Sequence, residues 1–275
     1  MSTDDTSTGN IIEVSHLVKK FGELTAVDDI SFSVRKGEIF AFLGPNGAGK
    51  TTTIKMLTTL LHPTSGTILI NGHDPQTDQD AVRKSFGIVF QDPSLDDELT
   101  AWENLELHGV LYAVPHKLRR DRMEQLLNVV GLADRRNDQV KHFSGGMKRR
   151  LEIARGLLHH PKILFLDEPT IGLDPQTRNH LWSHVQELNK SEGITVFLTT
   201  HYMEEADKVA SRIAVIDHGK IIAHGSSAEL KAQTSTTTLE DAFLALTGET
   251  IREEESGSVD TMRQMARMWG RTGRR

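Results

Sequence analysis

A glycine-rich run that ends in a lysine and two threonines has the spacing of a phosphate-binding loop. The run reads Gly44-Pro45-Asn46-Gly47-Ala48-Gly49-Lys50-Thr51-Thr52 and fits the pattern of a glycine, four residues and Gly-Lys-Thr. A strand-like apolar segment (38–43) precedes it and a helix-like segment (52–61) follows. Backbone N–H groups and the positive end of the helix dipole would therefore converge on one point. We expect Lys50 to reach the β- and γ-phosphates of a nucleotide and the Thr51 hydroxyl to bind Mg²⁺.

Two adjacent acids end a second apolar segment. Residues 163–168 read Ile-Leu-Phe-Leu-Asp-Glu, which indicates a buried strand that ends at Asp167 and Glu168. We expect this strand to lie beside the strand that enters the glycine-rich turn, with Asp167 holding Mg²⁺ through water. Glu168 would then polarise a water molecule that attacks the terminal phosphate. Two solvated acids after a core strand are the alternative, and the glycine-rich run favours the catalytic interpretation.

A third motif stands at the start of a predicted helix. Ser144 suits a helix N-cap, and Gly145 and Gly146 would let an anion approach the backbone of the first turn. The same three residues also form ordinary helix-capping turns, so this motif alone decides nothing.

Composition excludes several classes of protein. The chain has 275 residues, a net charge of −6 and no cysteine, which excludes a disulfide framework and a cysteine nucleophile. The acidic balance argues against a protein that coats nucleic acid. No apolar run approaches the ~18 residues that span a bilayer, and the polar N-terminus lacks the pattern of a signal peptide. We expect a cytosolic protein whose membrane association is peripheral or through a partner.

The order of elements predicts an α/β fold with a helical interruption. Strand-like segments at 11–18, 26–34, 38–43, 67–70 and 86–90 come first, and helical periodicity covers 101–114, 118–130 and 144–159. Strands at 162–166, 195–199 and 213–216 alternate with helices, which implies a parallel sheet. Residues 1–10 are predicted to be disordered, and the tail after about 250 is rich in charge.

These motifs together resemble the nucleotide-binding subunits of ATP-binding cassette (ABC) transporters, over about residues 11–233. The resemblance implies a P-loop NTPase fold with an antiparallel β subdomain, a helical subdomain at about 92–160 and a C-terminal extension at 234–275. It implies that Phe21 stacks on adenine, that Gln91 of the Q-loop senses Mg²⁺ and that His201 contacts the γ-phosphate. It further implies that Glu168 is the general base. Ser144, Gly145 and Gly146 correspond to the signature motif, and Asp174 to the D-loop.

The chain departs from the usual family pattern at positions that carry no catalytic group. Phe143 and Met147 stand where the signature usually has Leu and Gln, Gly172 replaces a common Ser in the D-loop, and Phe21 replaces a common Tyr. Hydrolysis should therefore be intact.

The resemblance implies an ATPase subunit that works as a dimer, which we expect to be a homodimer, on the cytoplasmic side of the membrane. ATP and Mg²⁺ are the expected cofactors, and an integral membrane permease is the expected partner, with no nucleic acid. Residues 238–248 are similar to the C-terminal segment of drug-exporting ATPases of the daunorubicin-resistance type, so we expect export of a drug-like or lipid-like compound. A non-transport ABC ATPase acting on nucleic acid or the ribosome, an importer ATPase and a hydrolysis-dead subunit are the alternatives.

Other charged and aromatic residues suggest secondary roles. His159 and His160 end a helix, where a cationic imidazole would suit the dipole. The basic run 148–150 is expected to form a solvated face or part of the nucleotide interface. Residues 91–114, with an acidic rim at 92 and 96–98, are the expected docking surface for the permease. The Met- and Arg-rich tail at 262–275 is either a basic amphipathic helix on anionic lipid or a solvated segment.

Overall fold

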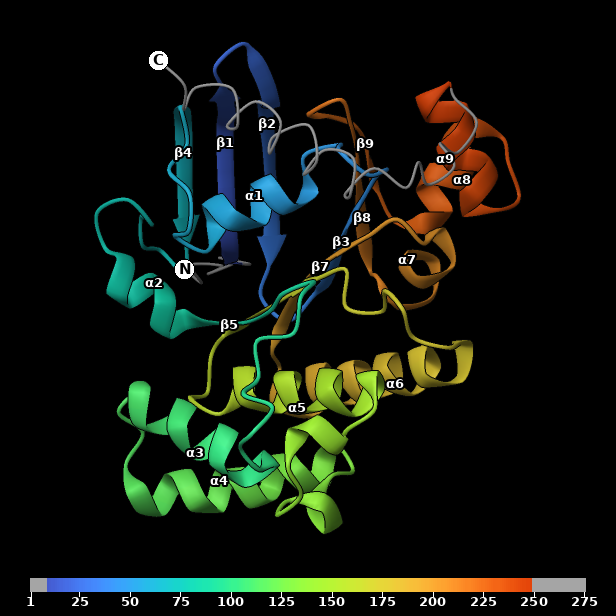
Figure 1. The fold of residues 1–275 in the computed structure, drawn as a ribbon. Coiled ribbons are helices and arrows are strands. Elements are labelled where there is room, and N and C mark those ends of the chain that lie inside the picture. Colours follow the sequence, from blue (N-terminus) through green and yellow to red (C-terminus); the bar gives the residue numbers. More distant parts are fainter. Residues whose placement is uncertain (1–8, 249–275) are drawn as a thin grey trace, which may run out of the picture.

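The computed structural model describes residues 9–248 of the chain (Figure 1). The basic tail and most of the N-terminal segment predicted to be disordered lie outside the described residues. The first strand, β1, begins at Asn10, one residue before the predicted start. None of the helices between residues 9 and 248 has both the length and the apolar character needed to cross a membrane.

A three-stranded antiparallel sheet forms one layer. Its strand order is β2-β1-β4, with bounds β1 (Asn10–Phe21), β2 (Leu24–Arg35) and β4 (Ser65–Ile70). The β1–β2 turn contains Gly22, whose φ of 57° is left-handed and suits glycine. Figure 1 shows these strands side by side, at the end of the molecule away from the green helices. This sheet is the antiparallel part of the predicted fold.

A second sheet carries the chemistry. Its order is β5-β6-β7-β3-β8-β9, with bounds β5 (Phe86–Val89), β6 (Ile163–Asp167), β7 (Thr195–Thr200), β3 (Ile39–Leu43), β8 (Arg212–Asp217) and β9 (Lys220–Gly225). Neighbouring strands are parallel except for β8 and β9. The expected pairing of β6 with β3 is wrong, because β7 lies between them and pairs with both. Every residue of β7 is buried, which suits this central position.

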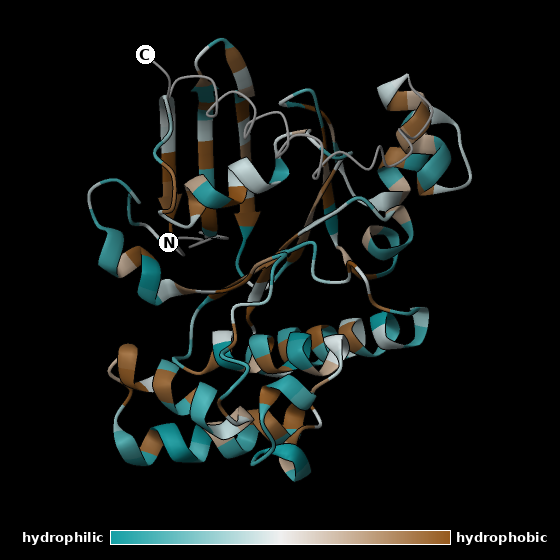
Figure 2. Ribbon diagram, viewed as in Figure 1, coloured by the Kyte–Doolittle hydropathy of each residue, from teal (hydrophilic) through white to brown (hydrophobic). Residues whose placement is uncertain are grey.

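The two faces of the parallel sheet enter different cores. Along β3, Phe40 and Phe42 face the antiparallel sheet and α1, whereas the alternate residues face the helices on the other side. Phe32 of β2 joins the layers, with its ring centroid 5.5 Å from that of Phe42. Burial of each such ring stabilises the fold by about 1.5–3 kcal/mol. The strands at the centre of the molecule are accordingly brown in Figure 2, whereas much of α4 is teal.

Helices surround these sheets. Their bounds are α1 (Lys50–Leu57), α2 (Gln79–Ser85), α3 (Ala101–Leu111), α4 (His116–Val129), α5 (Gly145–Leu157), α6 (Pro175–Glu192), α7 (Met203–Val209), α8 (Ser227–Thr234) and α9 (Leu239–Thr247). In Figure 1, α3, α4, α5 and α6 lie on one side of the parallel sheet, and α8 and α9 pack near α7 and β9. The helix predicted for 101–114 ends at Leu111, because Ala113 takes a left-handed φ of 54°.

Candidate active site

The glycine-rich turn connects β3 directly to the first turn of α1, as the sequence predicts. A Cβ on Gly44 would lie 2.2 Å from the carbonyl oxygen of Ile216, and one on Gly49 would lie 2.5 Å from that of Ala26. Gly49 also has a left-handed φ of 105°. Only glycine fits such close backbone approaches, so the turn can curl its N–H groups around an anion.

Lys50, at the start of α1, meets Glu168 and His201, which directly follow β6 and β7, at the mouth of this turn. Lys50 Nζ donates to the carbonyl oxygens of Gly44 and Pro45 at 2.8 and 3.1 Å. The same ammonium lies 2.8 Å from Glu168 Oε1, and His201 Nδ1 lies 2.9 Å from Glu168 Oε2. Lys50 and Glu168 are both buried. Burial raises the pKa of Glu168. The hydrogen bond from His201 and the charge of Lys50 lower it by more than burial raises it, so the pKa falls to about 2. The carboxylate is therefore ionised at neutral pH.

The backbone of Glu168 is strained in a way that aims its carboxylate. Its φ of 48° lies in the left-handed region, which costs a non-glycine residue on the order of 1 kcal/mol. The Glu168 N–H donates to Thr199 Oγ1 at 3.0 Å, and this contact from β7 holds the conformation. In this conformation the Glu168 carboxylate lies 2.8 Å from Lys50 Nζ.

Thr51 and Asp167 lie next to Lys50 and Glu168 in the chain and bring two oxygen atoms together that could bind a metal ion. Thr51 Oγ1 lies 3.3 Å from Asp167 Oδ1, which also accepts from Thr199 Oγ1 at 2.6 Å. Burial raises the pKa of Asp167, and the two threonine hydrogen bonds oppose the rise. A hydroxyl and a carboxylate beside a phosphate-binding turn fit Mg²⁺, which prefers oxygen ligands from a few side chains and the substrate phosphates.

A cavity of about 550 Å³ opens over these groups. Its lining combines most of the predicted residues with three that the sequence did not single out: Phe21, Leu24, Ala26, Asn46, Gly47, Gly49, Lys50, Thr51, Thr52, Gln91, Glu168, Ile171 and His201. Leu24, Ala26 and Ile171 are the additions. Leu24 pairs with Phe21 across the β1–β2 turn, so the Gly22 turn signal could have found it. Gly44, Pro45 and Ala48 belong to the turn without lining the cavity.

Phe21 stands at the edge of this cavity with its ring half exposed. Lys19 Nζ lies 5.0 Å from the ring centroid, within range of a cation–π contact. Phe21 and the more exposed Leu24 therefore offer an apolar platform at the outer end of a cavity whose inner end is charged.

Comparison with known proteins identifies the family. The family model described as ABC transporter matches residues 27–171. The chain belongs to the ABC transporter family. It is 46% identical to the daunorubicin/doxorubicin resistance ATP-binding protein DrrA of Streptomyces peucetius, over 83% of this chain and 69% of that protein. It is 43% identical to the linearmycin resistance ATP-binding protein LnrL of Bacillus subtilis, over 80% of this chain and 70% of that protein.

Solved structures agree with this assignment. The fold is similar to an ATP binding subunit of an ABC transporter, with a TM-score of 0.78 and 30% identity over 86% of this chain and 99% of that one. It is also similar to the dimeric, post-hydrolysis ATP-binding cassette MJ0796 bound to ADP and Pi, with a TM-score of 0.70 and 29% identity over 78% of this chain and 98% of that one. The predicted ABC-type P-loop fold and the ATPase class are thus confirmed.

The predicted ABC signature residues form a second cluster outside the cavity. Ser144 caps α5, with its Oγ accepting from the Met147 N–H at 3.3 Å. Asp174 caps α6 by accepting from the Thr177 N–H at 3.0 Å, and the hydrogen bonds from Thr177 lower the pKa of Asp174. A Cβ on Gly146 would lie 2.3 Å from Thr177 Cγ2, so the two helix starts are packed together. Within one chain, the signature and D-loop residues do not join Lys50 and Glu168.

Of the two alternatives for the basic run after the signature, a solvated face is wrong for Arg149, and a part in the nucleotide interface stays a prediction. Arg149 is buried, donates to the carbonyl oxygens of Phe90 and Gln91, and pairs with Glu152 at 2.9 Å. Its partners lie in the Q-loop segment of this ABC fold, so Arg149 ties that segment to α5. Lys148 is paired with Asp97 at 2.7 Å.

The interpretation of His159 as a cation at a helix end is also wrong. Burial lowers the pKa of His159 to about 4, so the imidazole is neutral at neutral pH. Its Nε2 lies 3.0 Å from the carbonyl oxygen of Phe86, and its ring stacks on Tyr112 at a centroid distance of 3.9 Å. His159 therefore packs the end of α3 against β5 and does not act as a cation at a helix end.

Proposed function

We propose that this ABC protein is the ATP-binding and ATP-hydrolysing subunit of an exporter and works with a separate membrane permease. The observation that carries the proposal is the meeting of Lys50, Glu168 and His201 at the mouth of the glycine turn. A buried cation beside an ionised carboxylate and an imidazole suits phosphoryl transfer to water, in which positioning and electrostatics do most of the catalysis.

Each residue takes one role in this reaction. The N–H groups of the 44–49 turn hold the phosphates, and Lys50 exchanges its carbonyl contacts for β- and γ-phosphate oxygens. Glu168, ionised because its pKa is about 2, orients the attacking water, and His201 contacts the γ-phosphate. Thr51, Asp167 and Gln91 would hold Mg²⁺, which neutralises charge on the phosphates. Phe21 would stack on the adenine ring.

The signature cluster supports a dimer. Ser144, Gly145 and Gly146 lie at the N-terminus of the 13-residue helix α5, outside the cavity of their own chain. In the proposed homodimer this helix start meets the ATP held by the second subunit, and Asp174 lies at the same interface. The dimer of the related cassette MJ0796 supports this arrangement.

The permease would dock on the helical side of the protein, within residues 91–114, and so hold the subunit on the cytoplasmic face of the membrane. The outward side of α3 presents Leu107, Val110 and Leu111, and Leu111 is 73% exposed. Exposed apolar side chains that gather on one surface often mark a site where a partner binds. Of the acidic rim, Asp97 and Glu98 already pair with Lys148 and Lys141. Within residues 9–248, Asp92 and Asp96 form no ion pair, so we propose them as the charges that meet a basic permease segment.

The names of the relatives favour export of a drug-like or lipid-like compound, since DrrA and LnrL are both described as resistance proteins. An importer ATPase and an ABC ATPase that acts on nucleic acid or the ribosome are the alternatives, and no feature of the described residues favours them.

The decisive test is ATP hydrolysis by the purified full chain. Lys50→Ala should lower kcat by a factor of about 100 or more, because it removes the cation that meets the transferred phosphate. Lys55→Ala is the matched control, since Lys55 is an exposed lysine on the same helix. Turnover by Lys50→Ala at the level of Lys55→Ala would contradict the proposal.

A further inference from the structure

Arg178, in the first turn of α6, links the D-loop to the segment that follows β7. Its Nε donates to the carbonyl oxygen of Leu173 at 2.9 Å, and its guanidinium centre lies 4.4 Å from the ring centroid of Tyr202. The planar guanidinium can keep both contacts because its N–H groups lie at the edge while its face covers the ring.

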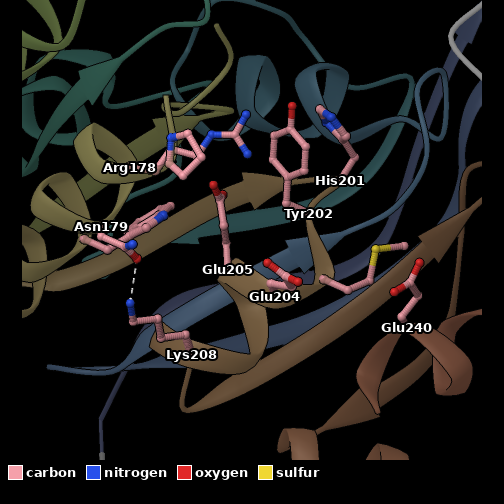
Figure 3. Close-up of a pocket in the computed structure, with 11 residues that line it drawn as sticks. Arg178, Asn179, His201, Tyr202, Glu204, Glu205, Lys208 and Glu240 are labelled. Carbon is pink, nitrogen blue, oxygen red and sulfur yellow. Dashed lines mark hydrogen bonds between the residues drawn. The ribbon is translucent and has the colours of Figure 1, made fainter. Parts of the chain in front are cut away.

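Tyr202 in turn packs against His201. The two ring centroids are 4.1 Å apart with an interplanar angle of 41°. Figure 3 shows the ring of Tyr202 between the guanidinium of Arg178 and the imidazole of His201. All three residues line a cavity of about 540 Å³, which also borders α7 and α9. The Tyr202 ring therefore has open space on one side. Its contacts with Arg178 and His201, and not dense packing all around it, hold the ring in position.

The other end of this chain of contacts reaches the signature turn. A Cβ on Gly145 would lie 3.6 Å from Leu173 Cδ2, and Gly146 packs against Thr177. The start of α5 therefore rests on the D-loop and on the first turn of α6, the same turn that carries Arg178. A displacement of the signature turn would move Arg178 and, through Tyr202, the imidazole that contacts Glu168.

We propose that Arg178 and Tyr202 are positioning residues for His201, and that they link its position to the D-loop and signature turn of the same chain. The proposal rests on the catalytic roles of Glu168 and His201 proposed above. Because the signature turn would contact the ATP of the second subunit, these residues connect occupancy of one ATP site with the geometry of the other. The physical basis is a contiguous set of contacts that runs from Gly145 to Glu168.

The test is steady-state ATP hydrolysis by variants of the full chain. Tyr202→Ala should lower kcat about tenfold and change KM for ATP less than about twofold, since it loosens the imidazole without touching the phosphate turn. Tyr202→Phe retains the ring and should stay within about twofold of wild type, and Tyr202→Leu, which keeps bulk without an aromatic face, should resemble Tyr202→Ala. Lys208→Ala is the control, because Lys208 lines the same cavity but bonds to Asn179.

A double variant tests whether the two residues act in series. Arg178→Ala should lower kcat by about three- to tenfold, and adding it to Tyr202→Ala should cause no further loss. The Hill coefficient for ATP should be above 1 in wild type and fall to about 1 in Tyr202→Ala. Losses in the double variant equal to the product of the single losses, or a Hill coefficient that Tyr202→Ala leaves unchanged, would overturn the link.

His201→Ala separates failure of this inference from failure of the proposed function. Wild-type kcat in His201→Ala would show that His201 has no catalytic role, and this would contradict both the positioning role and the proposed function of His201. Loss of kcat in His201→Ala with wild-type kcat in Tyr202→Ala and Tyr202→Leu would reject only the positioning role.

Discussion

Replacement of Glu168 by glutamine should separate ATP binding from ATP hydrolysis. The substitution keeps the shape of the side chain and removes its charge and its ability to take a proton from water. We expect kcat to fall by a factor of about 10²–10⁴, the usual contribution of a positioned general base. Binding of ATP should respond in the opposite direction, because Glu168 Oε1 now holds Lys50 Nζ at 2.8 Å.

The structure sets the size of the expected gain in ATP affinity. The pKa of Glu168 falls from 4.5 to about 2, so its surroundings favour the charged carboxylate. That difference corresponds to roughly 3 kcal/mol. The hydrogen bond from His201 and the charge of Lys50 both lower this pKa, so Lys50 accounts for a part of it on the order of 1 kcal/mol. Phosphates must draw Lys50 away from this pairing, so Glu168→Gln should bind ATP about tenfold more tightly.

Fluorescence titration with a non-hydrolysable ATP analogue measures binding, and phosphate release measures turnover. Glu204→Gln is the matched control, because Glu204 is an exposed carboxylate near His201 that contacts neither Lys50 nor the imidazole in the described contacts. Size-exclusion chromatography with ATP and Mg²⁺ should show the Glu168→Gln protein as a dimer. Normal turnover would refute the base role, and lost turnover without tighter binding would refute the competition for Lys50.

Three further outcomes follow from charge and exposure. Because the folded-state pKa of Glu168 is depressed, wild type should be more stable to urea than Glu168→Gln at pH 7 by up to about 3 kcal/mol. This advantage should shrink as pH falls from 4.5 toward about 2, and an equal advantage at pH 7 and pH 3 would contradict it. Leu111→Asp should reduce co-purification with the permease, whereas Leu60→Asp, an exposed leucine outside α3, should not; equal yields would reject the docking surface. Deletion of residues 256–275, which lie outside the described residues, should lower binding to anionic liposomes at an unchanged ATPase rate, and unchanged liposome binding favours a solvated tail.

The phosphate turn could be predicted because its chemistry is contiguous in sequence. Nine adjacent residues supply the glycines, the lysine and the two threonines, and the strand before them and the helix after them set the path of the turn. The helix start at Ser144 was predictable for the same reason, since an N-cap acts on the next few residues.

Features set by contacts distant in sequence were not predictable from local pattern. Arg149 looks solvated within a basic run, yet the Q-loop carbonyls and Glu152 compensate its burial. A signal was present, because Arg149 and Glu152 are three residues apart on one helix face. Tyr202 looks like an ordinary loop residue, and only the fold brings Arg178 to its ring.

The error in strand order shows why the active site has its geometry. Parallel strands end at the same edge of a sheet, so the residues after β3, β6 and β7 must meet there. With β7 in the centre, Thr199 bonds to Asp167 on one side and the Thr200 carbonyl accepts from the Gly44 N–H on the other. His201 follows directly and so enters between the phosphate turn and the two acids. Had β6 paired with β3, as predicted from the sequence, β7 could not have lain between them, and His201 would not have followed a strand that borders both. The strand between β3 and β6 is therefore the one that places His201 beside both the phosphate turn and the two acids.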